Sequence, residues 1–264
     1  MMKLAKIFTF ILLFASFFSC DKIGQTRSAG KAESMENIVS SDQEIGTASN
    51  AKKADKNDLF NRLAYAIYDK DLQAYEVDIE KFKNIDSLVL YTPNGEEYES
   101  YYSLLGLACK FNNLEVVRDL VKKGANINIG SEDETYAQDA MYYAITGANA
   151  EIVKILIDKG SNLNNLYTEN GMTPLILAVM DKKYLMAKIL LDHGSKVDGY
   201  TDLQAEYIYN PLRLAIEQED VEMVKILLKY KANIHLKDSQ GRDAKALAKD
   251  KKSKEIMQLL EKVN

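Results

Sequence analysis

Cysteine and histidine, the usual zinc ligands and reactive side chains, are few in this sequence: Cys20, Cys109, His193 and His235. A zinc site needs several such ligands at short spacing, and neither histidine has a cysteine or a second histidine close to it. Cys109 lies in an apolar segment, where a buried, inert thiol is expected. The acidic run 132–134 is more simply a solvated turn than a metal site. The sequence has no phosphate-binding glycine loop and no serine-hydrolase or zinc-protease motif, so we predict no catalytic residue, metal or cofactor.

Cys20 has a different context, because it follows a segment that is typical of export signals. Lys3 and Lys6 precede an apolar run over residues 7–18, which is too short to span a bilayer comfortably. The run ends in Ser19-Cys20, which resembles the lipobox of bacterial lipoproteins, although Phe17-Phe18 departs from the usual pattern. This resemblance implies a signal peptide over 1–19 and an acylated Cys20. An ordinary signal peptide with an incidental cysteine is the alternative.

The segment that follows is rich in small, polar and charged residues and has almost no large apolar ones. We therefore expect residues 20–57 to form a lipid-anchored flexible tether. Removing residues 1–20, which hold two lysines and no acidic residue, changes the formal net charge from −5 to −7. A mildly acidic chain of this kind is an unlikely partner for nucleic acid, so we predict none. The expected location is the bacterial cell envelope, on a membrane surface facing the periplasm or the cell exterior.

The rest of the sequence is dominated by a recurring phrase, clearest at 173–178 (Thr-Pro-Leu-Ile-Leu-Ala) and 210–215 (Asn-Pro-Leu-Arg-Leu-Ala). Each copy is followed by a second apolar run at helical spacing. The copies start 33 to 42 residues apart, near the ankyrin period of about 33. The starts are Asn61, Ser103, Asp139, Thr173, Asn210 and Asp243.

This pattern resembles the ankyrin repeat, and the resemblance implies an all-α solenoid of about six helix-turn-helix repeats over 58–264, with projecting inter-repeat turns. Every start is a residue whose side chain can cap a helix N-terminus. The second helices should begin with an acidic residue in copies two, three, five and six, and Gly124, Gly160 and Gly194 should end three of them with a left-handed residue. Lys231 occupies the same position in copy five. One alanine per copy should let the first helices approach closely: Ala66, Ala108, Ala144, Ala178, Ala215 and Ala248.

Ankyrin proteins usually meet their partners with the inter-repeat turns and the exposed ends of the first helices. Large apolar residues at such ends and tyrosines in the turns suit protein recognition, since tyrosine offers a wide contact surface at small entropic cost. The alternative for the large apolar side chains and the tyrosines is packing within the stack. The candidate contact residues are Tyr101, Phe111, Tyr136, Thr146, Tyr167, Met180, Tyr209 and Gln218.

Three functions remain open on the sequence alone. The first is a monomeric, non-catalytic protein-binding module, exported and held at a membrane by its lipid anchor. The second is an inhibitor or immunity-like protein that neutralises a toxin or enzyme, for which an acidic, tyrosine-rich face would suit a basic target. The third is an enzyme that no motif reveals.

Overall fold

The computed structural model describes residues 47–92, 100–129, 138–168, 171–200 and 209–263. Cys20, the predicted signal peptide and Tyr136 therefore lie outside the described residues, as does most of the predicted tether. The elements in chain order are α2 (Thr47–Asp69), α3 (Leu72–Ile79), β1 (Val89–Tyr91), β2 (Ser100–Tyr102), α4 (Leu104–Lys110), α5 (Leu114–Lys122), α6 (Ala140–Thr146), α7 (Ala150–Asp158), α8 (Pro174–Met180), α9 (Tyr184–Asp192), α10 (Pro211–Glu217), α11 (Val221–Lys229), α12 (Ala244–Asp250) and α13 (Lys254–Glu261).

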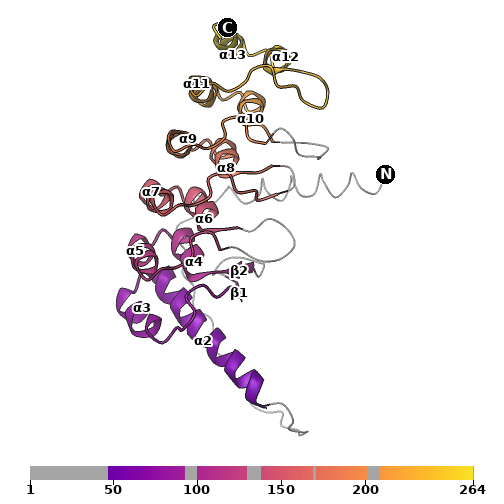
Figure 1. Ribbon diagram of the computed structural model, residues 1–264. Helices are drawn as coiled ribbons and strands as arrows, with labels where there is room; N and C mark the ends of the chain where they lie inside the picture. Colours follow the sequence, from indigo (N-terminus) through magenta and orange to yellow (C-terminus); the bar gives the residue numbers. More distant parts are fainter. Residues whose placement is uncertain (1–46, 93–99, 130–137, 169–170, 201–208, 264) are drawn as a thin grey trace, which may run out of the picture. The chain divides into compact units, whose positions relative to one another are not determined.

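The helices form pairs, and the pairs stack in sequence order. Repeats one to six are α2–α3, α4–α5, α6–α7, α8–α9, α10–α11 and α12–α13. Each first helix contacts the first helix of the next repeat, and from α5 onward each second helix contacts the next second helix, so two columns run side by side (Figure 1). The predicted array of paired helices is confirmed. Within the described residues, no helix combines the length and the apolar character needed to cross a bilayer.

Five of the six predicted helix starts are confirmed as N-caps. The Asp139 carboxylate, for example, accepts a hydrogen bond from the backbone N–H of Tyr142 at 2.9 Å. The other confirmed caps are Ser103, Thr173, Asn210 and Asp243. The expected acidic residues lie in the first turns of α5, α7, α11 and α13.

The predicted start at Asn61 is wrong, because Asn61 lies inside α2, which begins at Thr47. The last eleven residues assigned to the tether, 47–57, therefore belong to a helix. They include several alanines and lysines, which favour helix without any large apolar side chain. The tether prediction weighed only the missing apolar residues and overlooked this propensity.

Left-handed residues follow the first helix of every repeat and the second helix of repeats two to five. After each first helix this residue is not glycine: Lys70, Asn112, Ala148, Lys182, Glu219 and Lys252 all have φ between 53° and 57°. The next residue then donates its N–H to the carbonyl of the repeated alanine, as Asn113 does to Ala108 at 2.9 Å. After the second helices, Gly124, Gly160 and Gly194 are left-handed as predicted, and Lys231 shares this conformation with φ 65°.

Lys231→Gly is expected to raise the free energy of unfolding by about 1 kcal/mol, because a left-handed backbone strains a residue with a Cβ atom. Chemical denaturation of the two proteins measures the difference. Gly160→Lys, at the equivalent position with φ 86°, is the reciprocal control and should lose a similar amount. A variant Lys231→Gly no more stable than the wild type would contradict the strain at this turn.

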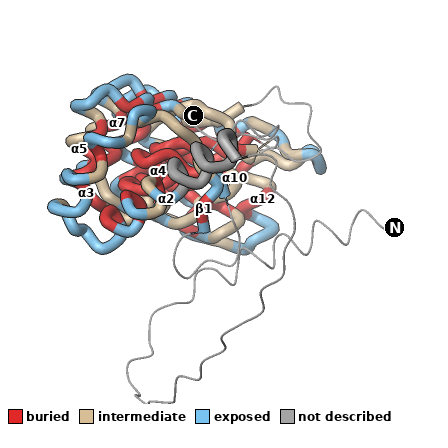
Figure 2. The backbone as a smooth tube through the Cα atoms, turned by 90° about the horizontal axis from the view of Figure 1, so that it is seen from below, coloured by how far each residue is buried: buried red, intermediate tan, exposed pale blue. Residues whose placement is uncertain are grey.

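The core is continuous along the stack and lies where the helices of adjacent repeats meet (Figure 2). All six repeated alanines are buried there, and five of them are completely inaccessible. Their small side chains let neighbouring first helices pack closely, which buries apolar area that a single repeat could not bury.

One element departs from the all-α expectation. β1 and β2 form an antiparallel pair between repeats one and two, with Leu90 opposite Tyr101 and Val89 opposite Tyr102. Tyr91 and Tyr102 are buried whereas Leu90 and Tyr101 are exposed, as expected for strands whose side chains alternate between two faces. β-branched and aromatic residues favour this short hairpin over a plain turn.

Successive turns between repeats are linked by hydrogen bonds from a backbone N–H of one turn to a side-chain oxygen of the turn before it. The carboxylate of Asp86 accepts from the N–H of Asn126 in the next turn at 2.7 Å. The same kind of bond recurs three times, each from a backbone N–H to a side-chain oxygen of the preceding turn: from Asn162 to Asn128, from Lys196 to Asn164 and from Asn233 to Asp198. These bonds fix the register of repeats one to five.

Candidate protein-binding surface

The histidine and cysteine side chains of the described residues are inert or isolated from one another. His193 and His235 are both exposed, and His193 contacts the carbonyl of Ile189 through Nδ1 at 2.7 Å. Cys109 is fully buried, and this burial raises the pKa of its thiol well above its usual range. The part of the chain that the structure describes holds no cluster of three potential metal ligands.

Three predicted contact residues have their polar groups turned into the stack. Tyr167 is only 5% exposed and donates its hydroxyl to the Asp139 carboxylate at 2.8 Å, so the prediction that its ring meets a partner is corrected. Thr146 donates its hydroxyl to two carbonyls of its own helix at 3.1 Å. Gln218 donates its side-chain amide to the carbonyl of Met180 at 3.0 Å. These three polar groups make hydrogen bonds within the stack, and the packing alternative for the tyrosines describes Tyr167.

The remaining predicted residues lie at or near the surface. Tyr101 is 40% exposed on the outer face of the hairpin. Phe111, Met180 and Tyr209 are partly buried against the core. Their exposed parts remain accessible, but packing accounts for much of their area.

The abundance of tyrosine is explained in part by bonds between repeats. Tyr75 in α3 donates its hydroxyl to Asp119 in α5 at 2.8 Å. Tyr184 in α9 donates its hydroxyl to Asp220 in the next repeat. In the opposite direction, Tyr230 of that repeat donates its hydroxyl to Asp192 in α9. Burial and the neighbouring carboxylate raise the pKa of Tyr75 above its usual value. A phenol in this position stabilises the stack and need not serve a partner.

The exposed large apolar side chains of the described residues concentrate at one end. Four of six, Tyr65, Tyr68, Leu90 and Tyr101, belong to α2 and the hairpin that contacts it; the other two are Val77 and Leu185. The Tyr68 ring meets Phe111 edge to face, with centroids 5.0 Å apart. We call Tyr65, Tyr68, Leu90, Tyr101 and Phe111 the aromatic surface. Aromatic side chains of this kind are favoured anchors in protein interfaces.

Sequence reasoning missed Tyr65 and Tyr68 because it considered the first-helix ends of repeats two to five only. The signal was present nonetheless. Tyr68 follows Ala66 by two positions, as Met180 follows Ala178, and this is the position at which each first helix nears its end.

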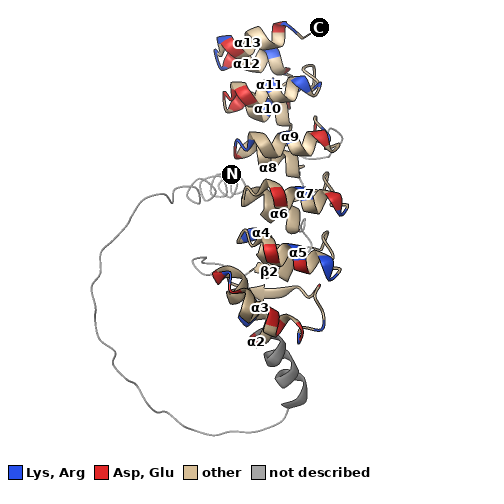
Figure 3. Cartoon of the chain, turned by 90° about the vertical axis from the view of Figure 1, so that its left-hand side faces the viewer, with Lys and Arg blue, Asp and Glu red and all other residues tan. Residues whose placement is uncertain are grey.

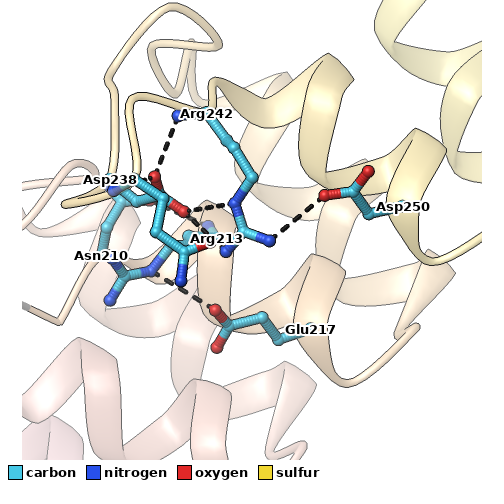
Figure 4. Close-up of polar contacts among 7 residues, drawn as sticks. Asn210, Arg213, Glu217, Asp238, Arg242 and Asp250 are labelled. Carbon is cyan, nitrogen blue, oxygen red and sulfur yellow. Dashed lines mark hydrogen bonds and ion pairs between the residues drawn. The ribbon is translucent and has the colours of Figure 1, made fainter.

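At the first-helix end of each of repeats four to six, one carboxylate has a cation of the same chain beside it. Asp181 lies 3.2 Å from Lys183, and Glu217 lies 3.7 Å from Arg213. Arg242 reaches both Asp238, at 2.8 Å, and Asp250, at 3.2 Å (Figure 4). Both signs are also mixed along the side of the stack seen in Figure 3. At these positions, cations of the same chain therefore offset the negative charge that a basic target would need.

Comparison with known proteins agrees with this geometry. A family model of three ankyrin repeats matches residues 105–201, and an ankyrin-repeat model matches residues 209–239. An ankyrin repeat protein of Fowlpox virus (strain NVSL) is 33% identical over 149 residues, which are 52% of this chain and 39% of the viral protein. Ankyrin repeat and SOCS box protein 11 of Mus musculus is 35% identical over 81 residues, which are 31% of this chain and 24% of the mouse protein.

An ankyrin repeat protein of Acanthamoeba polyphaga mimivirus is 26% identical over 134 residues, 51% of this chain and 17% of that protein. The chain thus spans less than half the length of each of these relatives. The stacked helix pairs, their capped starts and the matched segments together show that the chain is an ankyrin-repeat protein.

Proposed function

We propose that this chain is a non-catalytic module that binds another protein through the aromatic surface of repeats one and two. The observation that carries the proposal is the concentration of exposed Tyr65, Tyr68, Leu90 and Tyr101 in adjoining elements. Scattered apolar residues are normal on a protein surface, whereas a cluster of aromatic ones favours an interaction site. The stack supplies a rigid support, so little conformational entropy is lost when a partner docks.

The test is a Tyr65→Glu, Tyr68→Glu double variant, crosslinked in cells and analysed by mass spectrometry beside the wild type. Both side chains are more than 40% exposed, so the fold should persist, and a thermal melt checks this. We expect the crosslinked partner to be lost, because two carboxylates replace the apolar anchors. Leu185→Glu is the matched control, since Leu185 is 58% exposed on α9 in the other helix column, and it should retain the partner. An unchanged partner set in the double variant would contradict the proposal.

We further propose that the protein is exported and anchored to a bacterial membrane through acylated Cys20. Support comes from the sequence: two lysines, a short apolar run and a cysteine directly after Ser19. Metabolic labelling with palmitate is expected to mark the wild type and to be absent in Cys20→Ala. Cys109 remains in that variant as an internal control for labelling at another thiol. Equal labelling of both proteins would rule out Cys20 as the anchor.

The alternative of an inhibitor of a basic enzyme or toxin receives less support. It relied on an acidic face, and the carboxylates of Asp181, Glu217 and Asp250 have cations of the same chain beside them. Compensated charges give little attraction to a charged partner. A single partner bound at nanomolar strength would favour this alternative, whereas several weaker partners would favour a scaffold. The monomeric state and the absence of nucleic acid partners stay predictions.

A further inference from the structure

Two rings at the ends of neighbouring first helices form a corner within the aromatic surface. Tyr68 lies in the last turn of α2 and is 42% exposed, and Phe111 directly follows α4 and is partly buried. Their ring planes meet at 85°, with centroids 5.0 Å apart. Because the faces of aromatic rings carry negative partial charge, a corner of this kind suits a cation as well as an apolar group.

A neighbouring pair of rings binds a cation of the chain itself. The amino group of Lys110, the last residue of α4, lies 5.3 Å from the ring centroids of both Tyr102 and Tyr143. In repeat one, Tyr68 occupies the position that Lys110 has in repeat two, two residues after the repeated alanine. Within the described residues, no lysine or arginine lies over the ring of Tyr68 or Phe111. This corner therefore offers its ring faces to a cation from outside the described chain.

A carboxylate beside the corner runs against the preference of its helix. Asp69 is exposed and ends α2, where the helix macrodipole disfavours an anion. Among the described residues it takes part in no ion pair, unlike Asp58 and Asp78 of the same repeat. Burial, and then the nearby Tyr65 and Asp69, raise the pKa of Tyr91 above its usual value, so the Asp69 carboxylate lies close to the rings of this surface. Helix stability alone would favour a neutral or basic residue at position 69.

The charge of this part of the chain suits a basic partner. Residues 58–111 hold ten acidic and five basic side chains. Their formal net charge of −5 equals that of the entire chain, so the remaining residues are balanced in total. An excess of one sign attracts a partner of the opposite sign and helps to orient it.

We propose that the partner presents a lysine or arginine side chain to the corner formed by Tyr68, Phe111 and Asp69. The aliphatic part of that side chain packs on the rings, and its cationic head group contacts the ring faces and pairs with the Asp69 carboxylate. This inference rests on the proposed function and adds the chemical class of the partner, a protein with an exposed basic segment. A purely apolar partner would instead remove Asp69 from water without compensation, which is costly.

Photo-crosslinking of the full chain in cells tests the proposal, with the photoreactive amino acid at position 65. This position lies one helical turn before Asp69, on the same face of α2. After digestion with chymotrypsin, the captured peptide should carry a lysine or arginine close to the attachment site. Asp69→Lys should lower the yield about tenfold, because two like charges then face each other. Tyr68→Leu keeps an apolar side chain but removes the ring, and it should lower the yield about threefold.

Glu76→Lys is the matched control, since it changes the net charge of the chain by the same amount as Asp69→Lys. Glu76 is exposed on α3, in the second-helix column, so its substitution should leave the yield unchanged. A thermal melt should show that Asp69→Lys is at least as stable as the wild type, because a cation suits a helix C-terminus. A lower melting temperature would assign Asp69 a structural role and overturn the proposal.

The yields also separate this inference from the proposed function. Equal capture with Asp69 and with Lys at position 69 would overturn the cation contact, while the aromatic surface would remain the binding site. Equal losses from Asp69→Lys and Glu76→Lys would overturn it as well, since total charge rather than this corner would then control binding. No captured protein at position 65 in the chain with Asp69 would contradict both the proposed function and the inference that rests on it.

Discussion

Asp139→Ala is expected to lower the free energy of unfolding by about 3 kcal/mol. The Asp139 side chain is 1% exposed and accepts three hydrogen bonds: from the N–H of Tyr142, the hydroxyl of Tyr167 and the amide of Asn165. Alanine removes a helix cap, which alone is worth about 1 kcal/mol. It also leaves a buried phenol and an amide without their acceptor, and each orphaned group costs about 1 kcal/mol or more.

Two further variants separate these contributions in the same denaturation experiment. Asp243→Ala removes a cap whose side chain, among the described residues, bonds the N–H of Ala246, so it should cost about 1 kcal/mol. Asp139→Asn keeps the oxygen that faces Tyr142 and Tyr167, and it should cost less than half as much as Asp139→Ala. Burial raises the pKa of the Asp139 carboxyl, so loss of the charge itself is not costly; the cost of Asp139→Asn comes from the lost acceptor for Asn165. Equal losses for Asp139→Ala and Asp243→Ala would contradict the shared-acceptor explanation.

Ala144→Leu is expected to destabilise the protein by about 3 kcal/mol. Ala144 is completely buried in α6, which contacts both α4 and α8. A longer side chain there must push neighbouring first helices apart on at least one side, because close-packed interiors have no room for three additional carbon atoms. Urea denaturation followed by circular dichroism measures the change.

Ala246→Leu in α12 is the matched control. Ala246 is only partly buried, so its longer side chain can turn toward solvent and should change stability by less than about 0.5 kcal/mol. A small effect at both positions would show that the first helices are not held at close approach by their alanines.

The repeat frame was predictable because it depends on local chemistry. Ser103, Asp139, Thr173, Asn210 and Asp243 are caps for reasons that act within four residues, and Gly124, Gly160 and Gly194 end helices for reasons of backbone freedom. Asn61 shows the limit of this reasoning. A capping residue starts a helix only where the preceding chain is not helical, and the preceding residues here continue α2.

The contact surface was harder to predict, since it depends on which side chains the stack leaves uncovered. Tyr167 and Tyr101 have the same residue type and similar positions in the turns, yet one bonds buried Asp139 and the other points outward from a hairpin. Charge shows the same difficulty. The sequence reveals the carboxylates of Asp181 and Glu217, but only the fold reveals the cations beside them.

The most direct test of the binding function is a photo-crosslinking amino acid placed at position 68, with position 185 as the comparison site. The aromatic surface predicts a crosslinked protein partner at position 68 and none at position 185, because these positions lie on different helix columns with similarly exposed side chains. A partner captured at position 185 but not at position 68 would contradict the assignment of the aromatic surface as the binding site.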